Sequence, residues 1–468
     1  MSLPNQIHPF HVVGAGSQYQ VARSLRFRKS NSAYLSRTPS GAGNRQTWTW
    51  SGWVKFASIV STDYPTLFMG GATQSDTGAL RIGIGTNNLV VQGYNTNFIV
   101  SSQVFRDPSA WYHILIAFDT TQATASNRLK AYVNGTQITS FSTDNRASLT
   151  QNTNYGINQA ALHRIGYESA TFGSTYSDFY LGEYYFIDGQ ALTPSSFGTT
   201  DSVTGAWIPT RYTGTYGTNG FYLPFSDNSG ATATTIGKDS SGNGNNWTPS
   251  GISVTAGTTN DSLVDSPTSY GSDTGVGGEA RGNYCTINPL RKSASIAISN
   301  GNLYIDGNSG SVQWESIAST FLVKTGKWYF EFLVSSTYAA GNHMVGLARE
   351  DVNWSSSGQH YLTENSATGK ALDQNSTTND VVCVAFDMDL GYAWGTRNAS
   401  LGTNPTNGLS PDATFSTAYY WGPAFSMVCG RNNTGWANFG QRPFAYTAPS
   451  GFKALCTQNL PTPTIGLY

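Results

Sequence analysis

The chain has 468 residues, with 26 Lys and Arg against 27 Asp and Glu, and charged residues make up only 11% of it. The balanced charge, without a tract of Lys or Arg, argues against nucleic acid as a partner. The 51 Gly, 26 Tyr, 23 Phe and 12 Trp favour sheets and turns over charged helices. Because the length exceeds one ordinary core, we expect an all-β chain with two domains.

The first segment, residues 1–20, has no basic cluster followed by an apolar run and shows no helical or strand periodicity. Nowhere does the chain offer eighteen consecutive apolar residues. We therefore expect an extended N-terminal arm that another protein holds in place, no secretion signal and no membrane insertion.

From residue 21 onward, short β-rich runs alternate with turn clusters, which is typical of a sandwich or jelly roll. In the run 111–119, WYHILIAFD, bulky residues occupy both alternating sets of positions, so we expect a central strand covered on both faces. The pair Asn134-Gly135 predicts a type I′ hairpin. The other runs are 47–56, 80–85, 88–94, 128–135, 163–167 and 178–189.

Between residues 226 and 284 the composition shifts to Ser, Thr, Gly, Asn and Asp, which predicts a connector lying over the domain surfaces. Strand-like runs then resume and predict a second β domain over 285–468. The cysteines lack metal-ligand spacing and indicate buried thiols in a reducing compartment. They are Cys285, Cys383, Cys429 and Cys456.

The ordered runs of residues 21–225 resemble the laminin-G/pentraxin-like group of concanavalin-type jelly rolls, in the divergent form found in bacteriophage structural proteins. The series includes a Trp-Tyr-His strand, then a Tyr-Val-Asn-Gly hairpin, then a closing strand that ends in Asp-Gly. The stretches that carry it are TWTWSGWVKF (47–56), WYHILIAFD (111–119), RLKAYVNGTQI (128–138), HRIGY (163–167) and YSDFYLGEYYFIDGQALTPSSFG (176–198).

Residues 285–468 resemble a SPRY domain, another concanavalin-type β-sandwich, which typically binds proteins. One departure is residues 394–398, Trp-Gly-Thr-Arg-Asn, where the family has a Phe/Trp-Ser-Lys-Asn-Gly hairpin, so we expect that turn to differ. The matching stretches are GKWYFEF (326–332), MVGLARED (344–351), DVVCVAFDMDLGYAW (380–394), GPAFSM (422–427) and NFGQRPFAYTAPSGFKAL (438–455).

Together these features resemble virion proteins of tailed phages. The resemblance implies a tail or capsid fibre, or receptor-binding protein, that assembles in the host cytoplasm and resides in the virion. Its implied partners are other virion proteins, through the arm 1–20, and a glycan or protein receptor on the host surface. A homotrimer follows by analogy. A purely structural connector or decoration protein is one alternative.

A polysaccharide depolymerase is the other alternative. Glycoside hydrolysis needs two carboxylates about 5–10 Å apart across the sugar. The Glu-x-Asp-x-x-Glu strand pattern of concanavalin-type hydrolases is absent from the sequence, and Asp387 and Asp389 fall where a SPRY strand runs into a hairpin. We therefore expect a protein that is not an enzyme.

The stretch 237–247, GKDSSGNGNNW, opens like an oxygen-rich calcium loop when counted from Asp239. Position twelve, where a bidentate Glu belongs, is Ser250. Two interpretations stay open. One is a tight Asx/Gly turn with Trp247 as an apolar peg on a sandwich. The other is a weak calcium site at Asp239, Asn243 and Asn245; no other cofactor is expected.

A long polar segment, residues 349–380, separates two predicted strands of the second domain. Long loops of this kind tend to be functional. Its aromatic and imidazole side chains could stack on a sugar ring or anchor a protein. Trp354, His360 and Tyr361 are therefore candidate ligand-binding residues, with Trp354 as a peg for the loop the alternative.

Overall fold

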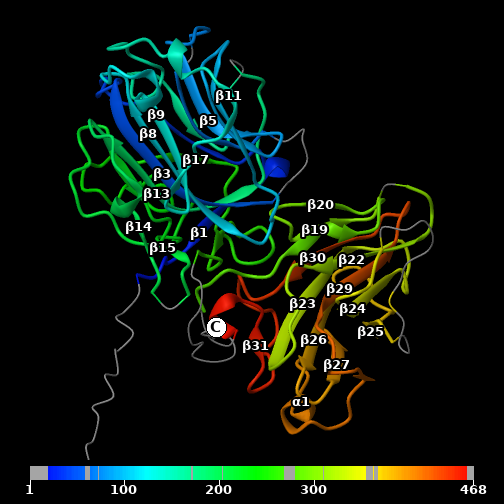
Figure 1. The fold of residues 1–468 in the computed structure, drawn as a ribbon. Helices are drawn as coiled ribbons and strands as arrows, with labels where there is room; N and C mark the ends of the chain where they lie inside the picture. The colour runs from blue at the N-terminus through cyan, green and yellow to red at the C-terminus, as the bar shows by residue number, and fades with distance from the viewer. Residues whose placement is uncertain are drawn as a thin grey trace, which may run out of the picture.

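The computed structural model describes residues 19–57, 64–71, 73–169, 172–202, 204–267, 280–308, 310–354, 362 and 367–460. Two antiparallel β-sandwiches contain nearly all the regular structure, which confirms the predicted all-β fold class (Figure 1). Helical turns in the described ranges are short: α1 (Asn404–Asn407) and the 3-10 turns η1 (Lys29–Asn31), η2 (Ala125–Asn127), η3 (Arg146–Ser148), η4 (Pro194–Ser196) and η5 (Thr457–Asn459).

The first sandwich packs two eight-stranded sheets face to face. One sheet has the order β10 (Thr136–Gln137), β9 (Leu129–Val133), β8 (Trp111–Asp119), β3 (Thr47–Phe56), β13 (Phe179–Asp188), β1 (Ser24–Phe27) and β18 (Ser262–Leu263), with β16 (Phe221–Leu223) paired to β13. The other has the order β11 (Phe141–Asp144), β7 (Asn97–Val104), β6 (Asn88–Gln92), β5 (Ala79–Gly85), β4 (Thr66–Gly71), β12 (His163–Ile165), β2 (Tyr34–Arg37) and β17 (Thr248–Ser250).

Strand β8 has the central position and double coverage that its sequence predicts. It lies between β3 and β9. Ile114 and Ile116 pack in the core between the sheets, while Leu115 packs on the opposite face beneath an outer layer. That outer layer includes the hairpin β14 (Gly198–Thr200) and β15 (Trp207–Pro209). The next hairpin, β9 to β10, turns at Asn134 and Gly135 with φ of 47° and 81°, as the Asn-Gly pair predicts.

The expected connector contributes directly to the first sandwich. Strand β17 pairs with β2, and β18 pairs with β1. The side chains of Ile236, Trp247 and Ile252 belong to the same buried cluster as the strands of the two sheets. This part of the Ser- and Gly-rich segment therefore closes the first core, with Trp247 only 1% exposed.

The second sandwich pairs a five-stranded sheet with an eight-stranded one. The smaller has the order β19 (Ile287–Lys292), β22 (Trp314–Ser319), β29 (Trp421–Val428), β24 (His343–Arg349) and β25 (Gly369–Asp373). The larger has the order β20 (Ala297–Ser299), β21 (Tyr304–Asp306), β30 (Thr434–Asn438), β23 (Lys327–Ser336), β26 (Val381–Asp387), β27 (Tyr392–Arg397) and β28 (Ala413–Thr414), and β31 (Lys453–Ala454) pairs with β23 in parallel.

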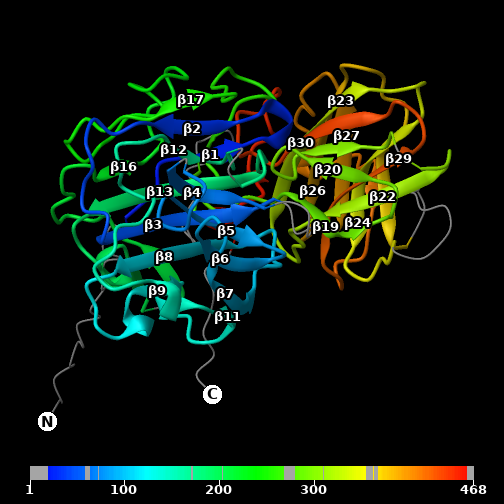
Figure 2. The ribbon, with the colours of Figure 1, turned by 90° about the horizontal axis from the view of Figure 1, so that it is seen from above.

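The two sandwiches lie side by side, and apolar side chains join them (Figure 2). Trp53, Trp111 and Tyr180 from the first sheet pack in one buried cluster with residues of the second sandwich. The four cysteines of the second half are buried. The face of the first sheet that points away from the first core is therefore partly buried against the second sandwich.

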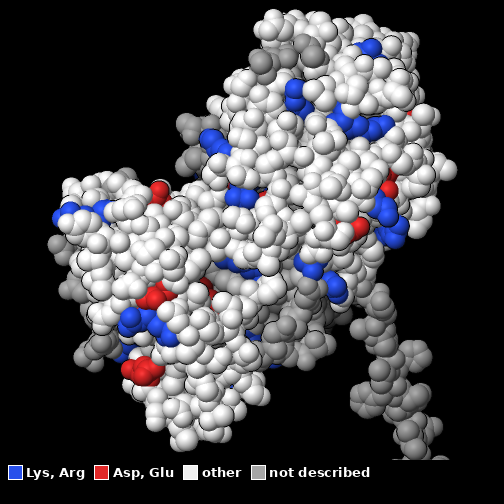
Figure 3. Space-filling model, turned by 180° about the vertical axis from the view of Figure 1, so that it is seen from behind, with Lys and Arg blue, Asp and Glu red and all other residues white. Residues whose placement is uncertain are grey.

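The surface carries few charges. On the face drawn in Figure 3, Lys and Arg side chains are scattered over a mostly uncharged surface. Within the described ranges, no helix is long and apolar enough to cross a membrane.

Candidate functional site

The loop that resembles a calcium site is closed by its own hydrogen bonds. Asp239 Oδ1 accepts from the backbone N–H groups of Tyr222 (2.9 Å) and Ser241 (2.8 Å). Asp239 Oδ2 accepts from the Ser241 hydroxyl (2.8 Å) and the Asn245 N–H (2.9 Å). Both oxygens of this 6% exposed carboxylate thus serve as acceptors for the turn.

Asn243 and Asn245, the two asparagines of the predicted calcium site, fasten the loop to the preceding segment. Asn243 Nδ2 donates to the carbonyls of Gly217 (2.7 Å) and Gly220 (2.9 Å). Asn245 Nδ2 donates to Gly220 (2.8 Å), and Asn245 Oδ1 accepts from Arg37. A cation at Asp239, Asn243 and Asn245 would have to displace these bonds. The described ranges contain no cluster of three His, Cys, Asp or Glu suited to a metal. Calcium stays a prediction.

A surface depression of about 770 Å³ lies beside this loop. Residues 211–218 form one side of it, and Ser240, Ser241 and Asn243 form the other. The rings of Tyr212 and Tyr216 meet edge to face there, with centroids 5.2 Å apart. Tyrosine rings among hydroxyl, amide and carbonyl groups are the features that bind a sugar ring and its hydroxyls.

A buried glutamate that the sequence analysis missed lies in β13, close to this depression. Glu183 is 2% exposed and accepts hydrogen bonds from the hydroxyls of Tyr185 (2.5 Å), Tyr222 (2.8 Å) and Tyr19 (3.0 Å). Burial raises the pKa of Glu183. The only sequence signal was one acidic residue within the apolar run FYLGEYYFID. Tyr19 lies at the C-terminal end of the predicted arm, so this cluster anchors the chain where the arm joins the first sandwich.

The predicted ligand-binding loop of the second domain is described only in part. His360 and Tyr361 lie outside the described residues. Trp354 is 6% exposed and packs with Met344 and Leu362, and the Arg291 guanidinium lies 5.8 Å from its ring centroid. Trp354 therefore acts as a peg that holds its part of the loop against the sandwich.

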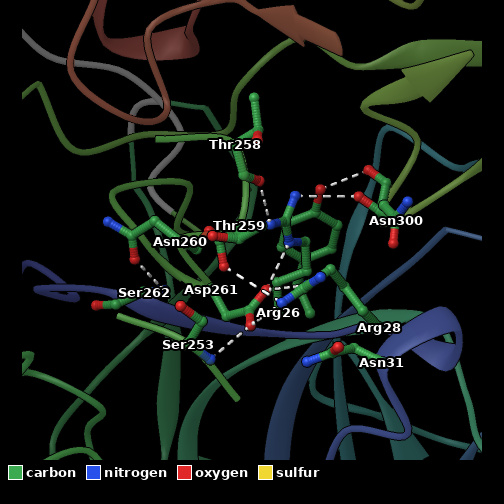
Figure 4. A network of polar contacts seen from close by, with 12 residues as sticks. Arg26, Arg28, Asn31, Ser253, Thr258, Thr259, Asn260, Asp261, Ser262 and Asn300 are labelled. Carbon is green, nitrogen blue, oxygen red and sulfur yellow. Dashed lines mark hydrogen bonds and ion pairs between the residues drawn. The ribbon is translucent and has the colours of Figure 1, made fainter. Parts of the chain in front are cut away.

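Two arginines of β1 and its C-terminal end converge on one buried aspartate of the connector (Figure 4). Asp261 Oδ1 accepts from Arg26 Nε (3.0 Å) and Arg28 Nε (2.7 Å), and Oδ2 accepts from Arg28 Nη2 (3.0 Å). Asp261 and Arg26 side chains are fully buried, and that of Arg28 is 7% exposed. Arg26 Nη1 also donates to the carbonyl of Asn300 (3.1 Å), in the second sandwich.

The same guanidinium groups fix the backbone of the connector. Arg26 Nη2 donates to the carbonyls of Thr258 and Asn260, both at 3.0 Å. Arg28 Nη2 donates to the carbonyl of Thr259 at 3.3 Å. Asp261 and its two arginines therefore hold residues 258–261 between the two sandwiches.

A second buried ion pair reinforces the junction. Lys55 Nζ lies 2.9 Å from Asp265 Oδ2 and also donates to the carbonyl of Tyr284 (2.8 Å). Asp265 Oδ1 accepts from Trp111 Nε1 (3.1 Å). Neither Asp261 nor Asp265 stands out in the sequence, because the side chains that bind them come from segments more than 150 residues away.

The carboxylates Asp387 and Asp389, weighed against a hydrolytic role, belong to a hairpin. Asp387 is fully buried, pairs with Lys327 at 3.2 Å, and accepts from the backbone N–H groups of Asp389 (2.9 Å) and Leu390 (3.1 Å). Asp389 Oδ1 accepts from the Gly326 N–H (3.1 Å). These bonds give both carboxylates a structural role at the end of β26.

Comparison with known proteins supports the concanavalin-like character of the first sandwich. Residues 29–196 match the Laminin_G_3 family model, described as the concanavalin A-like lectin/glucanases superfamily. No curated protein matches the chain. A jelly roll of concanavalin type is therefore the class of structure that these residues define, which agrees with the resemblance seen in the sequence.

Solved structures give partial likenesses. The SPRY domain of human HERC1 is 16% identical, with a TM-score of 0.25 over 32% of this chain and 96% of that chain. A heptameric SAP-like pentraxin from Limulus polyphemus is 14% identical, with a TM-score of 0.29 over 41% and 92%. The TRIM65 PSpry domain is 13% identical, with a TM-score of 0.24 over 33% and 89%.

Proposed function

We propose that this chain is an attachment protein of a tailed-phage virion and that its first sandwich binds a glycan on the host surface. The observation that supports this most is the depression beside the Asp239 loop, where the rings of Tyr212 and Tyr216 lie among hydroxyl and amide groups. The depression lies on the first sandwich, of which residues 29–196 match the concanavalin A-like lectin/glucanases superfamily. Its lining residues, 211–218, Ser240, Ser241 and Asn243, follow that matched range in the chain.

The state of the nearby carboxylates favours binding over hydrolysis. Glu183 does not line the depression and is held by three tyrosine hydroxyls. Asp239 is occupied by four donors of its own turn and of Tyr222. Hydrolysis would need two accessible carboxylates across the sugar, one of them able to give up a proton. A depolymerase is therefore the second candidate, and a purely structural virion protein is the third.

Other parts of the proposal concern assembly. The arm 1–20 would bind a neighbouring virion protein. The hydrogen bonds of Tyr19 to Glu183 and Tyr222 attach the C-terminal end of that arm to the first sandwich. The mature chain would reside in the virion as a homo-oligomer, with a trimer as the expected state. Removing residues 1–18 should then abolish incorporation into particles while both sandwiches still fold.

Binding of the purified chain to immobilised bacterial surface polysaccharides tests the glycan proposal. Tyr216→Ala should weaken binding about tenfold or more, because aromatic residues dominate such contacts. Tyr338→Ala is the matched control, since Tyr338 is 62% exposed on the second sandwich. Absence of binding to any polysaccharide, or equal binding by Tyr216→Ala, would contradict the proposal. Release of reducing sugar would replace it with the depolymerase.

A further inference from the structure

A second recess lies at the junction of the sandwiches, away from the depression of the first domain. It has a volume of about 500 Å³. Residues 256–259 of the connector form one wall of the recess. The other wall is the face of β23, β26 and β30 that points away from the second core. Leu333, Trp436 and Phe444 give it apolar surface, and the volume is that of a small-ligand site.

Arg442 lines this recess and is incompletely bonded. The residue is 5% exposed, and its Nη2 donates to the Ala437 carbonyl at 2.8 Å. Its Nη1 is buried without a hydrogen-bond partner among the described residues. A buried guanidinium N–H without an acceptor is costly, so an acceptor supplied by a ligand would stabilise the site.

The charged side chains that line the recess are Arg442 and Glu331, and two further arginines lie nearby. Arg26 and Arg28 share the single carboxylate of Asp261. Arg442 has Glu331 as its acidic neighbour, while Glu331 accepts from the Ala445 and Tyr446 N–H groups, both at 2.8 Å. Arg26 is close enough to Arg442 to lower its pKa, so an anion bound at Arg442 would offset this repulsion between the two guanidinium groups.

The pKa shifts of Arg442 and Glu331 also favour a bound anion. Burial lowers the pKa of Arg442 to about 9, with Arg26 adding to the effect, so the guanidinium still carries its charge at neutral pH. Burial raises the pKa of Glu331, so the negative charge of this acidic residue in the lining of the recess is disfavoured.

We propose that this recess binds a carboxylate-bearing sugar, a hexuronic or sialic acid unit, with the carboxylate on Arg442 and the ring against Trp436. A sugar ring matches a cavity that combines an aromatic wall with the Thr258 and Thr259 hydroxyl groups. The inference concerns a different surface from the attachment site and stands whether or not that site binds a polymer.

The connector wall explains why the site belongs to the whole chain. Arg26 and Arg28 hold the carbonyls of Thr258 and Thr259, so the ion cluster of Asp261 shapes one side of the recess (Figure 4). The other side is built from the second sandwich. Neither sandwich alone would form the site, so the experiment uses the full chain.

Titration calorimetry with glucuronic acid and N-acetylneuraminic acid tests the inference, with glucose, N-acetylglucosamine and inorganic phosphate as comparison ligands. At least one acidic sugar should bind about tenfold or more tightly than either neutral sugar. Equal affinity for neutral sugars would overturn the proposal. Phosphate bound as tightly as the acidic sugars would also overturn it, because the recess would then select only charge.

Variants distinguish ligand binding in the recess from binding to other basic side chains. Arg442→Gln should weaken the acidic sugar about tenfold or more. Thr259→Trp, at an exposed side chain whose carbonyl contact is kept, should block the recess without disturbing a core. Arg106→Gln, at an exposed arginine of the first sandwich, should bind as wild type. Wild-type affinity in folded Thr259→Trp would overturn the proposal, even if Arg442→Gln failed to fold. Tyr216→Ala should leave this binding unchanged.

Discussion

Asp239 and Asp261 lie in the same Ser- and Gly-rich segment, and both are buried, yet they have opposite structural roles. Asp239 accepts neutral hydrogen bonds, mostly from its own turn. Asp261 instead accepts from two guanidinium groups that lie 233 and 235 residues earlier in the chain. The first therefore stabilises a local loop, and the second holds together segments of both sandwiches.

The difference shows that composition alone does not define a carboxylate's role. The Asp239 stretch imitates a calcium loop because Asp, Ser, Asn and Gly serve both cation sites and tight turns. The Asp261 stretch resembles no known type of site, because its charged partners are distant in sequence. The fold determines which aspartate forms ion pairs at the junction of the two sandwiches.

The largest effect should come from Asp261→Asn. Removing this charge takes from the buried Arg26 and Arg28 the carboxylate that pairs with both of them, which should lower the free energy of unfolding by about 3–5 kcal/mol. Denaturant unfolding followed by tryptophan fluorescence measures it. Asp351→Asn, which removes an exposed pair with Arg349, is the control and should stay close to wild type. Equal stability of Asp261→Asn and wild type would show that the junction contributes little.

A smaller effect should come from protonation of His113, a buried histidine that lies outside both loops. His113 is buried, accepts from Trp207 Nε1 (3.0 Å) and bonds Ser51 Oγ (2.8 Å) through its other nitrogen, which requires the neutral ring. Burial lowers the pKa of His113 to about 3, below its ordinary value, so the unfolded chain binds the proton first. Its contribution is complete above pH 6.5 and is lost as the pH falls toward 3.

Between pH 7 and pH 5, wild type should therefore lose about 2 kcal/mol more stability than His113→Gln. Chemical unfolding of both proteins across this range measures the difference. Identical pH profiles would mean that His113 is not the neutral, buried bridge described above. The difference between the two proteins is the part of the acid sensitivity that comes from His113. It must be subtracted before the stabilities of the Asp239 and Asp261 variants are compared at low pH.

Asp239→Asn should cost less than Asp261→Asn. The amide keeps one acceptor oxygen and loses the other, so the Ser241 hydroxyl or the Asn245 N–H loses its acceptor. We expect a loss of about 1–2 kcal/mol in unfolding free energy. The sandwich junction should be unaffected, because none of the Asp239 partners belongs to the second half. A loss as large as that of Asp261→Asn would remove the distinction between the two loops.

The smallest effect should come from calcium. Because four donors already occupy the Asp239 carboxylate, adding calcium or a chelator should leave the melting temperature unchanged. Differential scanning calorimetry of wild type and Asp239→Asn in both solutions measures this. A rise with calcium that Asp239→Asn abolishes would establish the weak cation site that the sequence also allowed.

Much of the architecture could be predicted from local signals. Alternation in 111–119 and the Asn134-Gly135 turn identify a central strand and its hairpin, because strand period and turn type are local properties. The role of Trp247 as a peg was also visible, since one large apolar residue in a polar stretch has few other uses. The joining of residues 248–250 and 262–263 to the sheets was not, because pairing with β2 and β1 depends on tertiary contacts.

The candidate sites were harder to predict. The depression beside Asp239 combines a loop that the sequence singled out with residues 211–218, which it did not. The recess at Arg442 combines a connector loop with strands about 75 to 190 residues further along the chain. Such sites arise from packing between segments and leave no spacing pattern in the sequence.

The most direct test of the junction is the distance between the sandwiches in solution. Spin labels at Ala123→Cys and Ala399→Cys, both exposed positions, would report it by double electron–electron resonance. We expect one narrow distance distribution in the otherwise wild-type chain, unchanged by Asp239→Asn and broadened by Asp261→Asn. A broad distribution in the parent chain, or a narrow one in Asp261→Asn, would contradict this expectation.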